Sequence, residues 1–266
     1  MSYALITGAA KGIGSAVAAE MARKGYDLLL VDIDNNGLMK TKEKITDRHR
    51  VIVHILQLDL SVPDSAERIM EWSSPFHYEL NVVINNAGYG LYGAFENLSI
   101  DEHLNIVDVN IKAQMKIAYA FIPVLKKFKH SYLLNVGSTV CYQSVPYLSV
   151  YAASKAFVIS FTRSLRYELK DSPVSVSCLI PGSTDTDFVN RARMEERVRK
   201  TAGRFNMTAE AVAKIAVNGL FKGKSEIIPG FPNKLHAFFL KFFPKSFVEK
   251  IAAAIYKPRE NINFSQ

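Results

Sequence analysis

The stretch TGAAKGIG, from Thr7 to Gly14, follows directly on the apolar run Tyr3–Thr7 near the start of the chain. Its glycines suit the different demands of a nucleotide-binding turn. Gly8 allows a sharp turn, Gly12 lets backbone approach a pyrophosphate, and Gly14 lets the following helix pack closely on a sheet. That helix would aim free N–H groups and the positive end of its dipole at the phosphates. The spacing differs from the common G-x-G-x-x-G, but its place between a first strand and a first helix predicts a dinucleotide site.

Short apolar runs alternate with helix-length periodic segments along the rest of the chain. Several runs are apolar without alternation, as expected for strands covered on both faces. The β-α-β rhythm predicts an α/β fold with a doubly wound parallel sheet, a Rossmann fold, of about seven strands with helices on both faces. The predicted strands are Tyr3–Thr7, Asp27–Val31, Val51–Leu56, Val82–Ile84, Ser131–Val136, Val174–Ile180 and Glu226–Ile228. The predicted helices are Gly14–Lys24, Asp64–Trp72, Asn110–Lys127, Tyr151–Lys170 and Ala209–Phe221.

The length of 266 residues and the hydrophobic content of 48% fit one large core. We therefore expect a single domain over residues 1–266. Residues 183–204 are irregularly patterned and highly charged, which predicts a flap over the substrate. Residues 231–257 form an amphipathic C-terminal extension, which Pro244 divides into two short helices.

The net charge is +8, which allows nucleic acid, a membrane surface or an acidic substrate as a partner. The basic residues do not form one block and no nucleic-acid motif accompanies them, so a solvated positive face that attracts an anionic cofactor is favoured over nucleic acid. The two cysteines, Cys141 and Cys178, read as free thiols of a reducing compartment. The chain leaves no room for a signal peptide before Thr7, so a cytoplasmic location is expected. The histidines are scattered without ligand spacing, so no metal is expected.

Asp32 ends the second predicted strand, near the offset of the acidic residue that binds adenosine ribose. Its carboxylate would accept hydrogen bonds from the ribose hydroxyls and repel a 2′-phosphate, which favours NAD. Lys11 indicates the opposite, because an ammonium beside the ribose can bind the phosphate of NADP; it can also pair with Asp32 or face solvent. Close-range repulsion excludes a ligand more strongly than a flexible lysine attracts one. The sequence therefore favours NAD, with NADP through Lys11 or use of both as the alternative.

Tyr151 and Lys155 open a long helical pattern and share one helix face. An ammonium about 4–5 Å from a phenol, at an effective dielectric of about 20, favours the phenolate by roughly 3–4 kcal/mol. We therefore expect Lys155 to lower the pKa of Tyr151 by roughly 2–3 pH units, which would let it exchange a proton at neutral pH. Ser138 follows the strand Ser131–Val136 and could donate a hydrogen bond to a substrate carbonyl. Taken singly, such a pair is more often a surface pair, and such a serine more often caps a turn.

Further motifs follow in a fixed order along the chain. Asp59 comes after the third strand, and NNAG at 85–88 after the fourth. Asn110, Ser138, the Tyr151/Lys155 pair and then Pro181-Gly182 follow. Together with the TGAAKGIG turn, this set resembles the short-chain dehydrogenase/reductase family, in its single-domain branch, over residues 1–230. The resemblance implies an oxidoreductase that passes hydride between a nicotinamide cofactor and an alcohol or ketone.

The resemblance also implies roles for individual residues. Ser138, Tyr151 and Lys155 would form the catalytic set, with Asn110 holding a water that relays protons to Lys155. Tyr151 and Lys155 would touch the cofactor as well, and a homodimer or homotetramer would form through the Asn110–Lys127 and Tyr151–Lys170 helices. The resemblance adds Asp59, Leu60, Asn86, Ala87, Gly88, Pro181, Gly182, Thr184 and Thr186 as cofactor contacts. They join Gly8, Lys11, Gly12, Ile13 and Gly14 of the turn and Asp32.

By the same resemblance, substrate specificity lies in residues 89–96, residues 139–149 and the flap. The apolar and aromatic residues there predict a lipophilic substrate, such as a 3-oxoacyl chain, a steroid-like ring or another carbonyl compound. They are Tyr89, Leu91, Tyr92, Phe95, Val140, Tyr142, Val145, Pro146 and Leu148. Arg191 and Arg193 are two further charged candidates, either for an acidic substrate group or for solvent.

Two alternatives to an enzyme stay open from the sequence. One is a noncatalytic dinucleotide-sensing protein of the same fold, against which the complete set of Asn110, Ser138, Tyr151 and Lys155 argues. The other is a protein that binds a lipid surface or nucleic acid, suggested by the net charge of +8. Residues 231–257 are favoured as a hairpin over the core or a lip beside the substrate, ahead of an anchor on anionic lipid.

Overall fold

A parallel seven-stranded sheet forms the centre of the computed structural model, which describes residues 2–202, 206–240 and 242–258. Its strand order is β3-β2-β1-β4-β5-β6-β9, and all six pairings are parallel. The strands are β1 (Tyr3–Thr7), β2 (Asp27–Asp32), β3 (Val53–Gln57), β4 (Leu80–Asn85), β5 (Ser131–Val136), β6 (Val174–Leu179) and β9 (Glu226–Ile227). The predicted doubly wound fold is confirmed.

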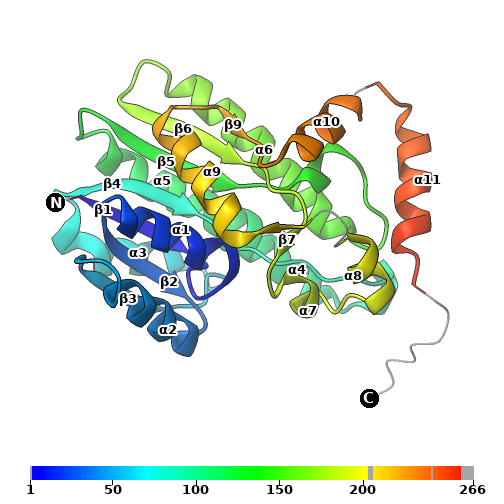
Figure 1. Ribbon diagram of the computed structural model, residues 1–266, viewed down its shortest axis with the longest axis horizontal. Coiled ribbons are helices and arrows are strands. Elements are labelled where there is room, and N and C mark those ends of the chain that lie inside the picture. The colour runs from blue at the N-terminus through cyan, green and yellow to red at the C-terminus, as the bar shows by residue number, and fades with distance from the viewer. Residues whose placement is uncertain (1, 203–205, 241, 259–266) are drawn as a thin grey trace.

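Helices cover both faces of the sheet (Figure 1). One face packs against α1 (Gly12–Arg23), α2 (Asn35–Thr46) and α9 (Ala209–Phe221). The other packs against α3 (Ser65–Ser73), α5 (Gln114–Leu125) and α6 (Ser149–Glu168). Successive residues of a strand point to opposite faces, so Leu5 packs in one of these layers and Ile6 in the other. Both side chains are fully buried, which explains why the strand sequences show no polar alternation.

The position of β1 determines where a ligand can lie. β1 pairs with β2 on one side and with β4 on the other, so the chain order reverses there. In an open parallel sheet, the loops at such a switch point part and leave a crevice beyond the carboxyl ends of the strands. The glycine-rich turn after β1, Asp32 at the end of β2 and the NNAG stretch after β4 all meet at this crevice.

Outside the flap, the helices α2 and α4 (Ile100–Val107) were not predicted. α2 is mostly polar, and its buried residues are Leu38, Thr41 and Ile45, so only its spacing could have revealed it. α4 begins with a capping box, in which Ser99 and Glu102 each bond the backbone of the other. That motif was a readable signal for a helix start. The predicted helix 110–127 proves to be a π-helical segment, η3 (Asp108–Ala113), followed by α5.

The predicted flap contains regular structure. β7 (Thr184–Asp185) pairs with β8 (Met207–Thr208), and between them lie the short helices α7 (Phe188–Arg191) and α8 (Glu196–Ala202). Residues 203 and 204 of the predicted flap lie outside the described residues.

The C-terminal extension forms two helices, as predicted around Pro244. They are α10 (Phe231–Phe239) and α11 (Lys245–Tyr256), and residue 241 between them lies outside the described residues. Figure 1 shows both at one end of the molecule, on the same side as the flap helices. Within the described ranges, the helices are too short or too polar to pass through a lipid bilayer.

Candidate active site

The turn after β1 has the backbone that its glycines predict. Gly8 and Gly12 have φ angles of 67° and 60°, in the left-handed region that favours glycine. At Gly14 the limit is space, because a Cβ there would lie 2.0 Å from the carbonyl oxygen of Gly8. The turn therefore brings helix α1 directly against strand β1.

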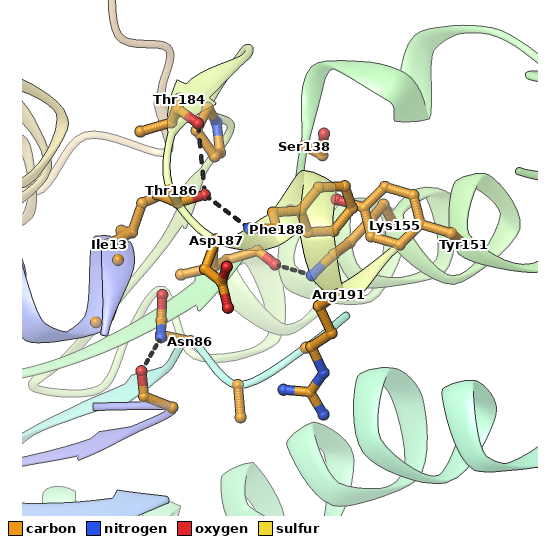
Figure 2. Close-up of a pocket in the computed structure, with 18 of the residues that line it drawn as sticks. Ile13, Asn86, Ser138, Tyr151, Lys155, Thr184, Thr186, Asp187, Phe188 and Arg191 are labelled. Atoms are coloured by element: carbon orange, nitrogen blue, oxygen red, sulfur yellow. Dashed lines mark hydrogen bonds between the residues drawn. The ribbon is translucent and has the colours of Figure 1, made fainter. Parts of the chain in front are cut away.

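Asn86 and Thr7 lock this turn to the end of β4. The Nδ2 of Asn86 donates to the carbonyl oxygens of Thr7 and Gly8, at 2.9 and 3.0 Å. The Thr7 hydroxyl in turn accepts hydrogen bonds from the backbone N–H groups of Asn86 and Ala87, both at 3.1 Å. Figure 2 shows Asn86 turned toward the glycine-rich turn. These hydrogen bonds hold the glycine-rich turn against the end of β4, at the base of the crevice.

The start of α1 fits a phosphate group. Its N-cap residue is Lys11, whose side chain makes no capping hydrogen bond to the helix. The first N–H groups of the helix therefore face the crevice with no capping side chain in the way. Thr186 of the flap lies opposite, since a Cβ on Gly12 would come within 3.2 Å of its methyl carbon. The glycine leaves a narrow cradle between helix and flap that suits a pyrophosphate.

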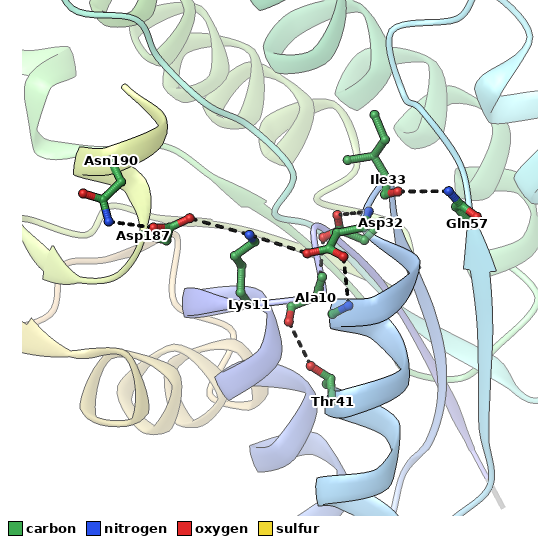
Figure 3. Close-up of polar contacts among 10 residues, drawn as sticks. Ala10, Lys11, Asp32, Ile33, Thr41, Gln57, Asp187 and Asn190 are labelled. Carbon is green, nitrogen blue, oxygen red and sulfur yellow. Dashed lines mark hydrogen bonds and ion pairs between the residues drawn. The ribbon is translucent and has the colours of Figure 1, made fainter. Parts of the chain in front are cut away.

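Asp32 and Lys11 take different partners from those considered from the sequence. The Asp32 carboxylate accepts hydrogen bonds from the backbone N–H groups of Ala10 and Asp34, both at 3.0 Å. Lys11 does not pair with Asp32. Its ammonium lies 3.5 Å from Asp34 and 3.6 Å from Asp187, and it thereby links the turn to the flap (Figure 3). Both carboxylates have pKa values held below the usual range, chiefly by hydrogen bonds from Gly37 to Asp34 and from Asn190 to Asp187, with Lys11 adding to the effect.

Ser138, Tyr151 and Lys155 converge at the other end of the crevice (Figure 2). Ser138 follows β5, and its hydroxyl accepts a 3.4 Å hydrogen bond from the N–H of Val140. Tyr151 and Lys155 lie one turn apart on α6 and are both buried. The Tyr151 ring packs against Gly90, where a Cβ would lie 2.8 Å from the ring. On another side it faces Phe188 of the flap, with 5.1 Å between ring centres.

Asn110 lies behind this group and does not line the cavity. It sits in the π-helical segment η3 and is fully buried. Its Nδ2 donates to the Tyr89 carbonyl at 2.8 Å and to the Ser154 hydroxyl at 2.9 Å, while its Oδ1 accepts from the Tyr89 N–H at 3.0 Å. A Cβ on Gly88 would lie 3.0 Å from the Asn110 Oδ1 and 3.1 Å from the Lys155 Nζ. Gly88 therefore allows the two side chains to approach the same backbone.

One cavity of about 490 Å³ contains the dinucleotide turn and the serine, tyrosine and lysine. Apart from Asn110, every residue assigned to the site from the sequence lines it. These residues are Gly8, Lys11, Gly12, Ile13, Gly14, Asp32, Asp59, Leu60, Asn86, Ala87, Gly88, Ser138, Tyr151, Lys155, Pro181, Gly182, Thr184 and Thr186.

Comparison with known proteins agrees with this geometry. The short chain dehydrogenase family model matches residues 2–197. The chain belongs to the short-chain dehydrogenase family. Its members are hydride-transferring oxidoreductases that depend on a nicotinamide cofactor.

Individual relatives cover most of the chain. A hydroxysteroid dehydrogenase-like protein 1 from Gallus gallus is 30% identical over 233 residues, which cover 86% of this chain and 68% of the relative. A 1-deoxy-11-beta-hydroxypentalenate dehydrogenase from Streptomyces avermitilis is 32% identical, covering 82% of this chain and 81% of the relative. A short-chain dehydrogenase from Sphingobium yanoikuyae in complex with NADPH superimposes with a TM-score of 0.79 at 25% identity, over 100% of both chains.

Several cavity residues of this short-chain dehydrogenase were missed from the sequence. They come from the flap and the C-terminal helices, where no motif marks them. The sequence carried little signal for these residues, because they reach the cavity only when the flap and the C-terminal helices fold back over the sheet. They include Asp187, Phe188, Val189, Met194, Asn233 and Tyr256.

Most of the residues predicted to contact the substrate do not line the cavity. Of the nine, only Val140 and Leu148 line the cavity. Tyr92 and Val145 pack in a buried cluster beneath the flap, and Tyr89 and Leu91 in another beside α4. Phe95 is exposed and stacks on His103. The remaining two, Tyr142 and Pro146, do not line the cavity either.

The two flap arginines differ in whether they reach the cavity. Arg191 lines the cavity and lies over the Tyr89 ring, at 4.4 Å from its centre. Arg193 does not reach the cavity, and it pairs with Glu102 at 2.8 Å. Only Arg191 is therefore in a position to meet a bound ligand.

Burial controls the protonation of the tyrosine and the lysine. It raises the pKa of Tyr151 to about 12, although a hydrogen bond with Ser138 partly opposes this. It lowers the pKa of Lys155 to about 8. The prediction that the pKa of Tyr151 falls is therefore wrong for the protein without bound cofactor. The Lys155 Nζ lies 5.9 Å from the ring centre and donates to the Val136 carbonyl at 2.8 Å, so the cost of burying a phenolate outweighs its attraction.

The low pKa of Lys155 predicts a stability that rises with pH. Between its folded pKa of about 8 and its ordinary value of 10.5, the unfolded chain binds more protons than the folded one. The free energy of unfolding should gain on the order of 2 kcal/mol from this group between about pH 8 and pH 10. Above pH 10, Tyr151 lowers the free energy of unfolding as the pH rises, because its pKa in the folded protein exceeds its ordinary value.

Urea denaturation of the wild type and of Lys155→Met at several pH values measures this contribution. The difference between the two unfolding free energies should change across the pH 8–10 window, whereas Lys170→Met, at an exposed position of the same segment, should leave the profile unchanged. Parallel profiles for wild type and Lys155→Met would show that Lys155 titrates normally.

Proposed function

We propose that this short-chain dehydrogenase interconverts a lipophilic ketone and its secondary alcohol, with NAD as the preferred cofactor. The observation that carries the proposal is the shared cavity. Ser138, Tyr151 and Lys155 face the same space as the glycine-rich turn and Asp32, so a dinucleotide bound along the turn and a substrate bound at Tyr151 would be neighbours.

The residues that would hold the cofactor follow from the crevice. The N-terminus of α1 and Gly12 suit the pyrophosphate, and Asp32 suits the adenosine ribose. Lys155 and the Pro181-Gly182 turn lie toward the catalytic end of the cavity, where they would hold the nicotinamide riboside. When bound, the reduced cofactor supplies the hydride and its oxidised form accepts one.

Residues of the chain itself would supply and stabilise the proton that the reaction transfers. Tyr151 keeps its proton at neutral pH because burial raises its pKa, so it serves as the acid that protonates the substrate oxygen in the reductive direction. Ser138 bonds the Tyr151 hydroxyl and can donate to the same oxygen as negative charge develops there. Lys155, with a pKa of about 8, is mainly cationic at pH 7 and favours that charge.

The substrate end of the cavity is lined by apolar side chains. Phe188 and Met194 of the flap region line it together with Val140, Leu148 and Tyr256, and all five belong to one apolar cluster. Such a lining favours a lipophilic carbonyl compound. Relatives whose names refer to hydroxysteroids and to a hydroxypentalenate support a bulky ring system as one substrate class. The flap and its Lys11–Asp187 contact would close over the bound cofactor.

We further propose that residues 1–266 act as one catalytic unit in the cytoplasm, as a homodimer or homotetramer. Support for self-association comes from apolar side chains exposed on the outer faces of α5 and α6, where Met115, Tyr119 and Phe157 face outward. Exposed apolar side chains on neighbouring helices are typical of subunit contacts.

A screen of ketones and secondary alcohols, followed by nicotinamide absorbance with NADH and NADPH, tests the proposed activity. We expect turnover of bulky apolar ketones and faster turnover with NADH. Cofactor binding without turnover of any compound in the series would favour the dinucleotide-sensing alternative. Equal turnover of small polar and bulky apolar ketones would refute the proposed substrate class.

A further inference from the structure

The C-terminal helices carry an outer face that the fold leaves exposed. Figure 1 shows these two helices at one end of the molecule. On α10, on α11 and between them, several apolar side chains are 43–74% exposed. We call this set the aromatic face. Its members among the described residues are Phe231, Leu235, Phe238, Phe239, Phe242, Phe243, Phe247 and Ile251.

Five of the aromatic rings form two sets of neighbours. The Phe238 ring lies 5.0 Å from the Phe242 ring and 5.8 Å from the Phe239 ring. The Phe243 ring lies 6.1 Å from the Phe247 ring. Single exposed apolar residues are ordinary, but exposed groups of this kind mark a binding surface.

The aromatic face is not needed to hold the two helices in place. Their inner sides bury Ala237, Val248 and Ala252 against the body of the protein. α11 is further fixed by a 3.0 Å hydrogen bond from the Ser144 hydroxyl to Glu249. The inner sides of α10 and α11 therefore attach the extension to the body of the protein. The aromatic face on their outer side is left to bind a partner.

The charge around the aromatic face indicates the partner. Residues 231–257 contain five lysines and a single acidic residue, Glu249, which accepts a hydrogen bond from Ser144. Lys234, Lys245 and Lys250 are exposed on the same two helices. Phenylalanine among exposed lysines on amphipathic helices suits the interface of an anionic bilayer, where rings enter the acyl boundary and ammonium groups meet the lipid phosphates. A second copy of the chain fits less well, because pairing two such faces would bring like charges together.

We propose that the aromatic face docks this protein on the surface of anionic phospholipid membranes. The same two helices contribute Asn233 and Tyr256 to the wall of the catalytic cavity. A docked molecule would therefore hold the wall of its substrate cavity against the bilayer, where lipophilic ketones concentrate. This last step, delivery of substrate from the membrane, rests on the proposed function, whereas docking itself does not.

Sedimentation with vesicles tests the docking. The full chain should sediment with phosphatidylcholine vesicles that contain phosphatidylglycerol, and less with phosphatidylcholine alone. Replacing Phe242, Phe243 and Phe247 by serine should weaken binding at least about tenfold, because binding scales with the apolar area inserted. Lys245→Glu and Lys250→Glu should each weaken it by on the order of fivefold, with a loss of salt dependence.

Tyr78→Ser is the matched control, because Tyr78 is 91% exposed and lies outside the C-terminal helices. It should leave vesicle binding unchanged. Unaltered binding of the triple serine variant, or no sedimentation of the wild type with anionic vesicles at low salt, would overturn the proposal. A wild-type dimer that the triple variant loses, without any vesicle binding, would identify a second copy as the occupant instead.

Kinetics separate docking from the proposed activity. The triple serine variant should turn over a water-soluble ketone at the wild-type rate, because none of its altered residues lines the cavity. With a lipophilic ketone carried in anionic vesicles, its rate should fall severalfold relative to the wild type. Vesicle binding by a wild type that turns over no ketone would sink the proposed function and leave docking intact. Equal rates of the two proteins on the vesicle-carried ketone would refute delivery alone.

Discussion

Tyr151→Phe is expected to lower kcat for ketone reduction by about 10²- to 10⁴-fold, the contribution typical of a positioned proton donor. The substitution removes one hydroxyl and keeps the ring that packs on Gly90 and faces Phe188. Cofactor binding should therefore persist, because the glycine-rich turn, Asp32 and Lys155 are untouched. Steady-state kinetics together with quenching of protein fluorescence by NADH measure the two effects separately.

Tyr256→Phe provides the matched control. Tyr256 lines the same cavity, is largely buried and would lose the same hydroxyl, but it lies on α11, and the hydrogen bond with Ser138 belongs to Tyr151. Its variant should keep kcat within about threefold of the wild type, since only groups that exchange a proton in the transition state contribute the full factor. Similar losses in both variants would indicate that polarity of the cavity, rather than proton donation by Tyr151, supports the reaction.

The sequence was sufficient to predict the sheet and the nucleotide end of the cavity. Strands such as Tyr3–Thr7 and Ser131–Val136 are buried on both faces, so their apolar runs are continuous and their observed bounds match the predicted ones. The glycines of the turn were predictable for a similar reason. Positive φ at Gly8 and the lack of space at Gly14 are local demands that glycine meets best. Such local constraints on the backbone appear directly in the sequence as glycines at fixed positions.

The substrate end was less predictable because tertiary packing decides which side chains reach it. Tyr92 and Val145 were expected in the cavity for their size and apolar character, but the same character buries them beneath the flap. Tyr256 lies more than a hundred residues from Tyr151 and reaches the cavity only because α11 folds back. The pKa of Tyr151 failed as a prediction for a related reason. Helical spacing gives the neighbour of a phenol but not the extent of its burial, and burial is the larger effect here.

Asp32→Ala is expected to shift cofactor preference toward NADPH by about 100-fold, because close like charges cost several kcal/mol and each 1.4 kcal/mol is a factor of ten. In the proposed binding mode the Asp32 carboxylate would face the adenosine ribose, at the place that a 2′-phosphate would need. Lys11 is held by Asp34 and Asp187, so a phosphate would compete with two carboxylates for its ammonium. Removing Asp32 relieves the repulsion, although the competition for Lys11 remains.

The ratio of kcat/KM with NADH to that with NADPH measures this preference. Asp32→Ala also removes the acceptor for the N–H groups of Ala10 and Asp34, so Asp32→Asn, which keeps an acceptor oxygen, separates charge from local structure. Asp59→Asn is the control in the same cavity, because its loss of charge at the adenine end should weaken both cofactors alike. If both Asp32 variants kept the wild-type ratio while Asp59→Asn behaved as expected, the ribose would lie away from Asp32, and repulsion there could not explain a preference for NAD.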